Sequence, residues 1–177
     1  MRKAMVPMLL LAIVFLAAAA PVHAQGGTVS TRLRAFEEVP ALSTPGGGFF
    51  TATINEEGTE ISWQLRYFNM EGNVTQAHLH FAQKGVNGGI MVFLCSNLGN
   101  GPFGTQVCPT DNGTVSGTIR GTDVIGGAAS QGIAPGELFS VLRGIRAGVV
   151  YANVHTDLFP AGEIRGQVQF TPAPPNP

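Results

Sequence analysis

Short apolar segments separated by clusters of turn residues run through most of this sequence, and they constrain its fold more than any other feature. Clusters such as P-G-G-G at 45–48 and D-N-G at 111–113 separate apolar runs of five to eight residues. Chains in which strands alternate with tight turns show this pattern. It predicts an all-β fold, an antiparallel sandwich or barrel, with strands at 28–35, 49–54, 60–68, 74–81, 90–95, 113–120, 149–156 and 164–170.

Alternation within the segments indicates strands that pack one face on a common core. Ile61, Trp63 and Leu65 are each followed by a polar residue, and successive strand side chains point to opposite faces. The segment 135–147 differs, because its apolar residues recur at helical spacing and Gly148 follows its end. We therefore expect one short helix there.

The N-terminal segment has the pattern of a secretory signal peptide. A basic start, Met1-Arg2-Lys3, precedes an apolar run at 5–20 and the small-residue motif V-H-A at 22–24. We expect cleavage after residue 24 and a secreted or periplasmic protein. No later segment has the length and apolarity of a membrane helix, so no integral membrane span is predicted.

The rest of the chain is predicted to form one domain over 25–170. The Pro-rich tail at 171–177 should stay outside the sheet and be disordered. Ten basic and eleven acidic residues are scattered without a basic stripe, which argues against a nucleic-acid partner. No nucleophile elbow or phosphate loop is present, so the sequence favours a non-enzymatic role.

Two cysteines, Cys95 and Cys108, stand thirteen positions apart. An oxidising compartment favours a disulfide between them. The alternative, a metal-binding or reactive thiol pair, has less support because the spacing matches no zinc motif.

Three histidines fall in two predicted strands: His78 and His80 in 74–81, and His155 in 149–156. Residues two apart in a strand share a face, so His78 and His80 point the same way. The same alternation places His155 and the valines of its strand on different faces of that strand. All three imidazoles are expected on the polar, outward side, and they would converge if the two strands are neighbours.

Three imidazole nitrogens are a common donor set for copper or zinc. The alternatives are a hydrogen-bonded polar cluster that fixes strand register and a site for an organic or carbohydrate ligand. Four more residues share the predicted face and would orient the rings or line a binding surface: Tyr151, Asn153, Glu163 and Arg165. For Glu163 and Arg165 the alternative is an exposed ion pair, and for the other two an ordinary place on the sheet surface.

Four motifs in this order resemble the chordin-type, or CHRD, domain: A-H-L-H at 77–80, G-G-I at 88–90, V-Y-A-N-V-H-T at 150–156 and P-A-G-E-I-R-G-Q at 160–167. The resemblance spans about 33–170 and implies an immunoglobulin-like β-domain, with little implied about activity. A weaker likeness is to the copper/zinc superoxide dismutases, β-sandwiches that also use an H-x-H strand pair as copper ligands. After loss of His23 with the leader, three histidines are too few for a dinuclear site.

Two functions follow as expectations. The first is a non-catalytic binding module of the extracytoplasmic compartment, with an unidentified protein or cell-surface partner. The second is a copper or zinc protein on His78, His80 and His155, with carrier or dismutase-like redox activity.

Overall fold

The structure, a computed structural model, describes residues 26–174. Within that range the chain forms nine strands, one α-helix and three short 3-10 helices. The predicted signal peptide at 1–24 lies outside the described residues. No helix in the described range has the length and apolarity needed to cross a membrane.

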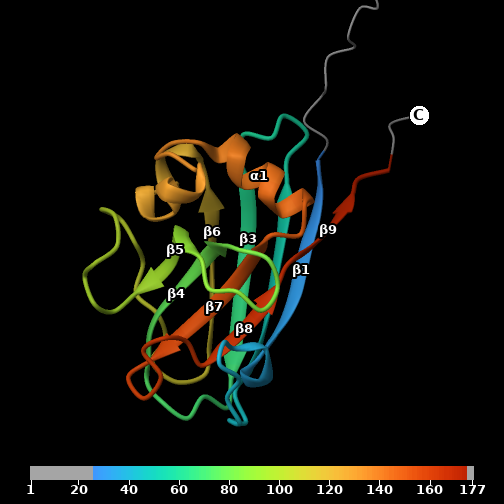
Figure 1. Ribbon diagram of the computed structural model, residues 1–177. Coiled ribbons are helices and arrows are strands. Elements are labelled where there is room, and N and C mark those ends of the chain that lie inside the picture. Colours follow the sequence, from blue (N-terminus) through green and yellow to red (C-terminus); the bar gives the residue numbers. More distant parts are fainter. Residues whose placement is uncertain (1–25, 175–177) are drawn as a thin grey trace, which may run out of the picture.

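All nine strands belong to one antiparallel sheet, in the order β5-β4-β7-β8-β1-β2-β3-β6, with β9 also pairing β1 (Figure 1). This confirms the predicted all-β fold. The strands are β1 (Gly27–Arg34), β2 (Gly47–Ile54), β3 (Ile61–Phe68), β4 (Val74–Phe81), β5 (Gly89–Ser96), β6 (Gly113–Ile119), β7 (Val150–Thr156), β8 (Ile164–Gln167) and β9 (Gln169–Pro172).

The sheet curls into a nearly closed barrel, in which β4 and β7 cross in front of β3 (Figure 1). Its two end strands, β5 and β6, are bridged by the side chain of Gln106. The Nε2 amide of Gln106 donates to the carbonyls of Leu94 on β5, at 3.2 Å, and Ser116 on β6, at 3.1 Å. These bonds satisfy edge carbonyls that would otherwise lack a partner strand.

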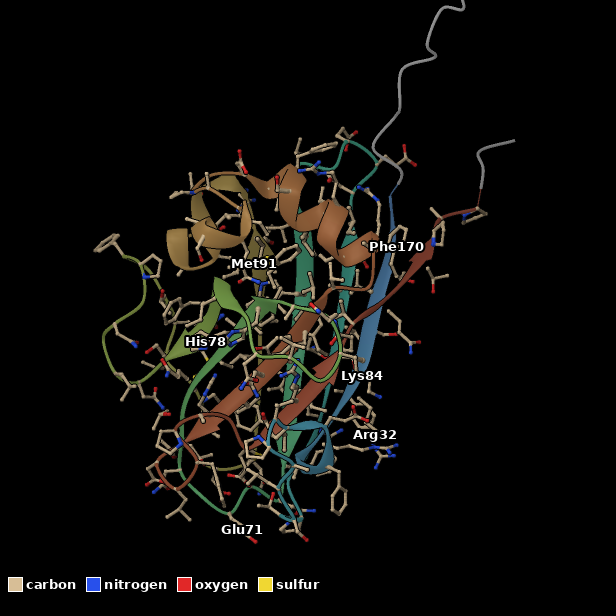
Figure 2. All side chains as sticks on the ribbon, viewed as in Figure 1. Arg32, Glu71, His78, Lys84, Met91 and Phe170 are labelled. Atoms are coloured by element: carbon tan, nitrogen blue, oxygen red, sulfur yellow. A yellow bond between two sulfur atoms is a disulfide. The ribbon has the colours of Figure 1, made fainter. Side chains whose placement is uncertain are left out.

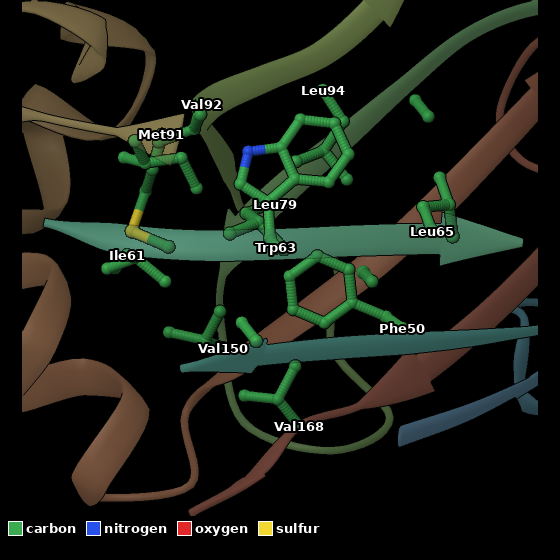
Figure 3. Close-up of a cluster of buried hydrophobic side chains, with 14 of the residues drawn as sticks. Phe50, Ile61, Trp63, Leu65, Leu79, Met91, Val92, Leu94, Val150 and Val168 are labelled. Carbon is green, nitrogen blue, oxygen red and sulfur yellow. The ribbon is translucent and has the colours of Figure 1, made fainter. Parts of the chain in front are cut away.

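Buried apolar side chains form one core cluster inside the barrel (Figure 3). On β3 the predicted alternation holds, since Ile61, Trp63 and Leu65 are buried and the residues between them are exposed. Trp63 stacks with Phe50 of β2 at 6.4 Å between ring centroids (Figure 3). Burial of each such side chain contributes about 1.5–3 kcal/mol relative to exposure.

The helix α1 (Leu138–Arg146) covers one end of the barrel (Figure 1). It begins three residues later than predicted because Gly136 adopts a left-handed φ of 86° in the turn before it. Its end agrees with the prediction: Gly148, at φ 69°, follows the last turn. The 3-10 helices η1 (Ala35–Glu37), η2 (Gly121–Asp123) and η3 (Gly126–Gln131) were not predicted.

The outer face of β4, β7 and β8 is covered by other parts of the chain, so every residue of β7 is buried. The loop between β4 and β5, residues 82–88, crosses in front of this face (Figure 1). It is tied to the segment after β1 by the ion pair of Lys84 with Glu37, at 3.1 Å, and by Asn87, whose amide donates to the carbonyl of Val39.

The C-terminal segment pairs further than predicted. The strand predicted at 164–170 is two strands, β8 and β9. Thr171 and Pro172, expected outside the sheet, pair with Thr28 and Gly27 of β1. Proline is tolerated there because β9 is an edge strand that pairs only with β1 in the described part of the chain. Residues 175–177 of the predicted tail lie outside the described range.

The predicted disulfide is present between Cys95 at the end of β5 and Cys108, with 5.2 Å between their Cα atoms. It closes the loop 96–107, which lies between β5 and β6 in the sequence and projects from the barrel (Figure 1).

Candidate metal centre

The three histidines meet on the outer face of two adjacent strands. β4 and β7 pair antiparallel, with His78 opposite Asn153 and His80 opposite Tyr151. The ring centroids lie 4.9 Å apart for His78 and His155, and 5.4 Å apart for His78 and His80. One ligand nitrogen from each ring lies within 4.8 Å of the other two. Figure 2 marks His78 on β4, the strand between β5 and β7.

The sequence predicts imidazoles on the outer face of the sheet, exposed to solvent. In the structure they lie on that face but are buried. His78 is 0% exposed, His155 5% and His80 7%. The parity was right, but loops close over this face of the sheet. The ring of Phe93, on β5, adds apolar cover by meeting His78 edge-on at 4.3 Å.

Backbone carbonyls from two loops fix two of the rings. Nδ1 of His80 lies 3.0 Å from the carbonyl oxygen of Gly88, and Nδ1 of His155 lies 2.9 Å from that of Pro160. A carbonyl can only accept, so in both neutral rings the proton is on Nδ1 and the lone pair is on Nε2. Such an outer hydrogen bond is the usual way in which proteins orient a metal-binding imidazole.

Two of the remaining ring nitrogens, Nε2 of His78 and Nε2 of His80, are buried and have no hydrogen-bond partner among residues 26–174. Nδ1 of His78 lies 3.1 Å from Nε2 of His155. In the metal-free protein this is a hydrogen bond. If the His78 proton moves to Nε2, the same two nitrogens can bind one ion, because two ligands of a tetrahedral ion with bonds near 2.1 Å are about 3.4 Å apart.

Burial lowers the pKa of all three imidazoles, to about 2 for His78 and about 4 for His80. For His78 the neighbouring imidazoles lower the pKa further. The rings are therefore neutral at neutral pH, the state in which imidazole binds metal. Nitrogen ligands of one tetrahedral or three-coordinate ion lie about 3.4–3.6 Å apart, so the widest pair here, within 4.8 Å, must approach by up to roughly 1.4 Å.

The model of the CHRD domain family matches residues 29–168 of the chain. The chain belongs to the CHRD domain family. The match includes all three histidines and both cysteines, and it confirms the resemblance seen in the motifs. Comparison with curated proteins and with solved structures gave no match.

Two of the four predicted neighbours of the CHRD histidines build a stack behind His80. The ring of Tyr151 lies parallel to that of His80, with 4.7 Å between centroids and a 6° interplanar angle. The guanidinium carbon of Arg165 lies 3.5 Å from the centroid of the Tyr151 ring. Arg165 also donates to Asn87 Oδ1, at 2.9 Å, and to the carbonyl of Val86, at 2.7 Å. The stack thus fixes both His80 and the loop that covers it.

The other two predicted neighbours serve different parts of the CHRD fold. Asn153 is buried and donates to Glu38 Oε1 and to the carbonyl of Ile164. Glu163 is 0% exposed, and its carboxylate accepts hydrogen bonds from two loops and from Thr156 of β7.

Two interpretations of Glu163 from the sequence are therefore corrected. Backbone carbonyls, rather than its carboxylate, orient His80 and His155. Glu163 and Arg165 are not an exposed ion pair, because both are buried and bond to other groups. Strand parity places the two side chains on one face, but it does not show which loops cover that face.

Sequence reasoning missed one buried acid near this face. Glu38 is 7% exposed, and burial raises its pKa to about 7 against the opposing effect of its hydrogen bond from Asn153. A glutamate in an irregular segment carries no periodic signal that would separate it from surface acids. Phe93 and Gly88 were likewise not predicted as neighbours of the histidines.

Proposed function

We propose that this CHRD domain is an exported metal-binding module that holds one copper or zinc ion with His78, His80 and His155. The observation that supports it most is the convergence of three buried imidazoles: one nitrogen of each lies within 4.8 Å of the other two, and within the described residues His78 Nε2 and His80 Nε2 have no hydrogen-bond partner. A buried polar atom left without a partner costs about 1–3 kcal/mol. Two such atoms in one cluster are typical of a site that a bound ion completes.

The competing explanation is a cluster that serves only to fix the register of β4 and β7. Such a cluster would be expected to use the nitrogens in hydrogen bonds within the protein. Four of the six ring nitrogens do form hydrogen bonds, but within the described residues Nε2 of His78 and Nε2 of His80 have none. The arrangement therefore favours a bound metal ion over a cluster that is held only by its own hydrogen bonds.

Two observations support the exported location. A disulfide closes one loop, and disulfides persist in oxidising compartments. The N-terminal sequence also has the pattern of a signal peptide. Holding or carrying a metal ion needs no catalytic group beyond the three imidazoles.

Calorimetric titration of the purified protein with copper or zinc tests the proposal. We expect one equivalent to bind, and His80→Ala to weaken the affinity at least about 100-fold, because one of three ligands is lost. Gln64→Ala, on the exposed face of β3, is the matched control and should bind as the wild type does. Equal, weak binding by wild type and His80→Ala would show that the cluster is only structural.

A second candidate function, a protein-interaction module, is favoured by the surface of the disulfide-closed loop 96–107. Three apolar side chains stand exposed there: Leu98 at 56%, Phe103 at 109% and Val107 at 73%. Exposed apolar groups gathered in one loop are typical of contact surfaces.

Photocrosslinking tests this second candidate in the exported protein. A photoreactive residue in place of Phe103 should give one recurrent crosslinked partner, whereas the same residue in place of Gln64 should give none. Identical crosslinks at both positions would reject the loop as a specific contact surface.

A further inference from the structure

We infer that the ion at His78, His80 and His155 is copper(I), and that the site selects it over zinc(II) and copper(II). The inference rests on the proposed metal-binding function and deepens it. It is carried by four features of the site: the charge of its donors, the charge of its surroundings, its burial and the number of its donors.

The donors supply no negative charge. All three are neutral imidazoles, and within residues 26–174 the candidate ligand group contains no carboxylate or thiolate. Metal sites for divalent ions commonly include an anionic ligand that offsets part of the charge of the ion. A divalent ion here would keep its full charge of +2, and a cuprous ion would keep +1.

The surroundings do not supply the missing charge either. The Glu163 carboxylate is used by Thr44, Thr156 and two backbone amides. Glu38 bonds to Asn153, and burial raises its pKa to about 7, so this acid is partly neutral at neutral pH. Neither acid has a hydrogen bond to any of the three rings in the described part of the chain.

The charged group stacked against the site is positive. Arg165 lies 3.5 Å from the ring centroid of Tyr151, whose ring is stacked on His80. Arg165 is 2% exposed, so water screens its charge poorly. Its field opposes any cation bound at His80, and it opposes a divalent ion twice as strongly as a monovalent one.

Burial acts in the same direction. The three rings are 0–7% exposed, and Phe93 covers His78 edge-on. In a Born description the cost of transferring an ion from water rises with the square of its charge, so it is about four times larger for a divalent ion. An uncompensated divalent ion is therefore disfavoured relative to copper(I).

Coordination number gives a further reason. Zinc in proteins takes four ligands, and in three-histidine sites the fourth is a water or substrate. Copper(I), with a filled d shell, is stable with three nitrogen ligands and needs no water. Three converging imidazoles under an apolar ring match the cuprous requirement.

The test compares the three ions on the whole exported protein. Copper(I) affinity is measured without oxygen by competition with bathocuproine disulfonate, and zinc(II) and copper(II) affinities by calorimetry. We expect the dissociation constant for copper(I) to be at least about 100-fold lower than for zinc(II) and copper(II). X-ray absorption at the copper edge should show a three-coordinate cuprous ion with nitrogen ligands.

The variant Phe93→Asp places a carboxylate beside His78 and should lower the preference for copper(I) over zinc(II) at least about 10-fold. Phe93→Leu is the matched control and should keep the preference. If Phe93→Asp does not fold, the wild-type comparison alone decides.

Zinc(II) or copper(II) binding as tight as copper(I), and lost in His80→Ala, would overturn the inference and leave the proposed function intact. No binding of any ion would overturn both.

Discussion

Replacing Glu163 with alanine is expected to lower the free energy of unfolding by about 3–5 kcal/mol. Each carboxylate oxygen of Glu163 accepts two hydrogen bonds. The donors are Thr44 Oγ1, at 3.3 Å, Thr156 Oγ1, at 2.9 Å, and the backbone amides of Glu71, at 2.8 Å, and Gly72, at 3.3 Å. Alanine would leave these donors without their acceptor. It would also remove the hydrogen bonds that hold two loops near the end of β7.

Urea unfolding measures this effect, with Glu60→Ala as the control. Glu60 forms an ion pair with Arg120 at 2.8 Å, but the two side chains are 41% and 56% exposed. Removal of that exposed pair should cost less than about 1 kcal/mol. Similar losses for Glu163→Ala and Glu60→Ala would contradict the assignment of Glu163 as the buried acceptor that joins these loops.

Acid should destabilise the metal-free protein steeply. Between pH 5 and 6 histidines are mostly protonated in the unfolded chain, whereas burial lowers the pKa of the three imidazoles in the folded protein, to about 2 for His78 and about 4 for His80, so that these two stay neutral. Glu38 acts in the opposite sense, because its raised pKa of about 7 keeps a proton on the folded protein that the unfolded chain has released. His78, His80 and Glu38 together leave the unfolded state with about one more proton than the folded state, so stability rises with pH.

A difference of one proton corresponds to about 1.4 kcal/mol of stability per pH unit, and the lowered pKa of His155 acts in the same direction. Urea unfolding at several pH values in this window, with a chelator present, should show this slope. Glu38→Gln removes the opposing group and should steepen the slope by about 1.4 kcal/mol per pH unit. A metal-free protein whose stability is flat between pH 5 and 6 would contradict the buried, neutral state of the histidines.

Much of the fold was predictable because its signals are local. The alternation of Ile61, Trp63 and Leu65 depends only on the two-residue period of a strand, and it holds in the structure. The end of α1 was predicted from Gly148, whose left-handed conformation stops the helix. The start of α1 was missed, because nothing in the sequence separates the turn at Gly136 from a first helical turn.

The candidate site was only partly predictable because its cover is not local. Parity placed His78, His80 and His155 on the polar faces of their strands, and pairing of β4 with β7 brings them together. That the face is buried depends on loops distant in sequence, such as 82–88. For the same reason the contacts of Gly88 with His80 and of Glu38 with Asn153 could not be predicted.

An anomalous difference map from crystals of the copper-loaded protein, collected at the copper edge, tests the three-histidine site most directly. Our account predicts one strong peak about 2.0–2.3 Å from a ring nitrogen of each of His78, His80 and His155. The peak should be missing from crystals of His80→Ala grown and loaded in the same way. A peak elsewhere on the protein, or loaded crystals without density between the three rings, would contradict it.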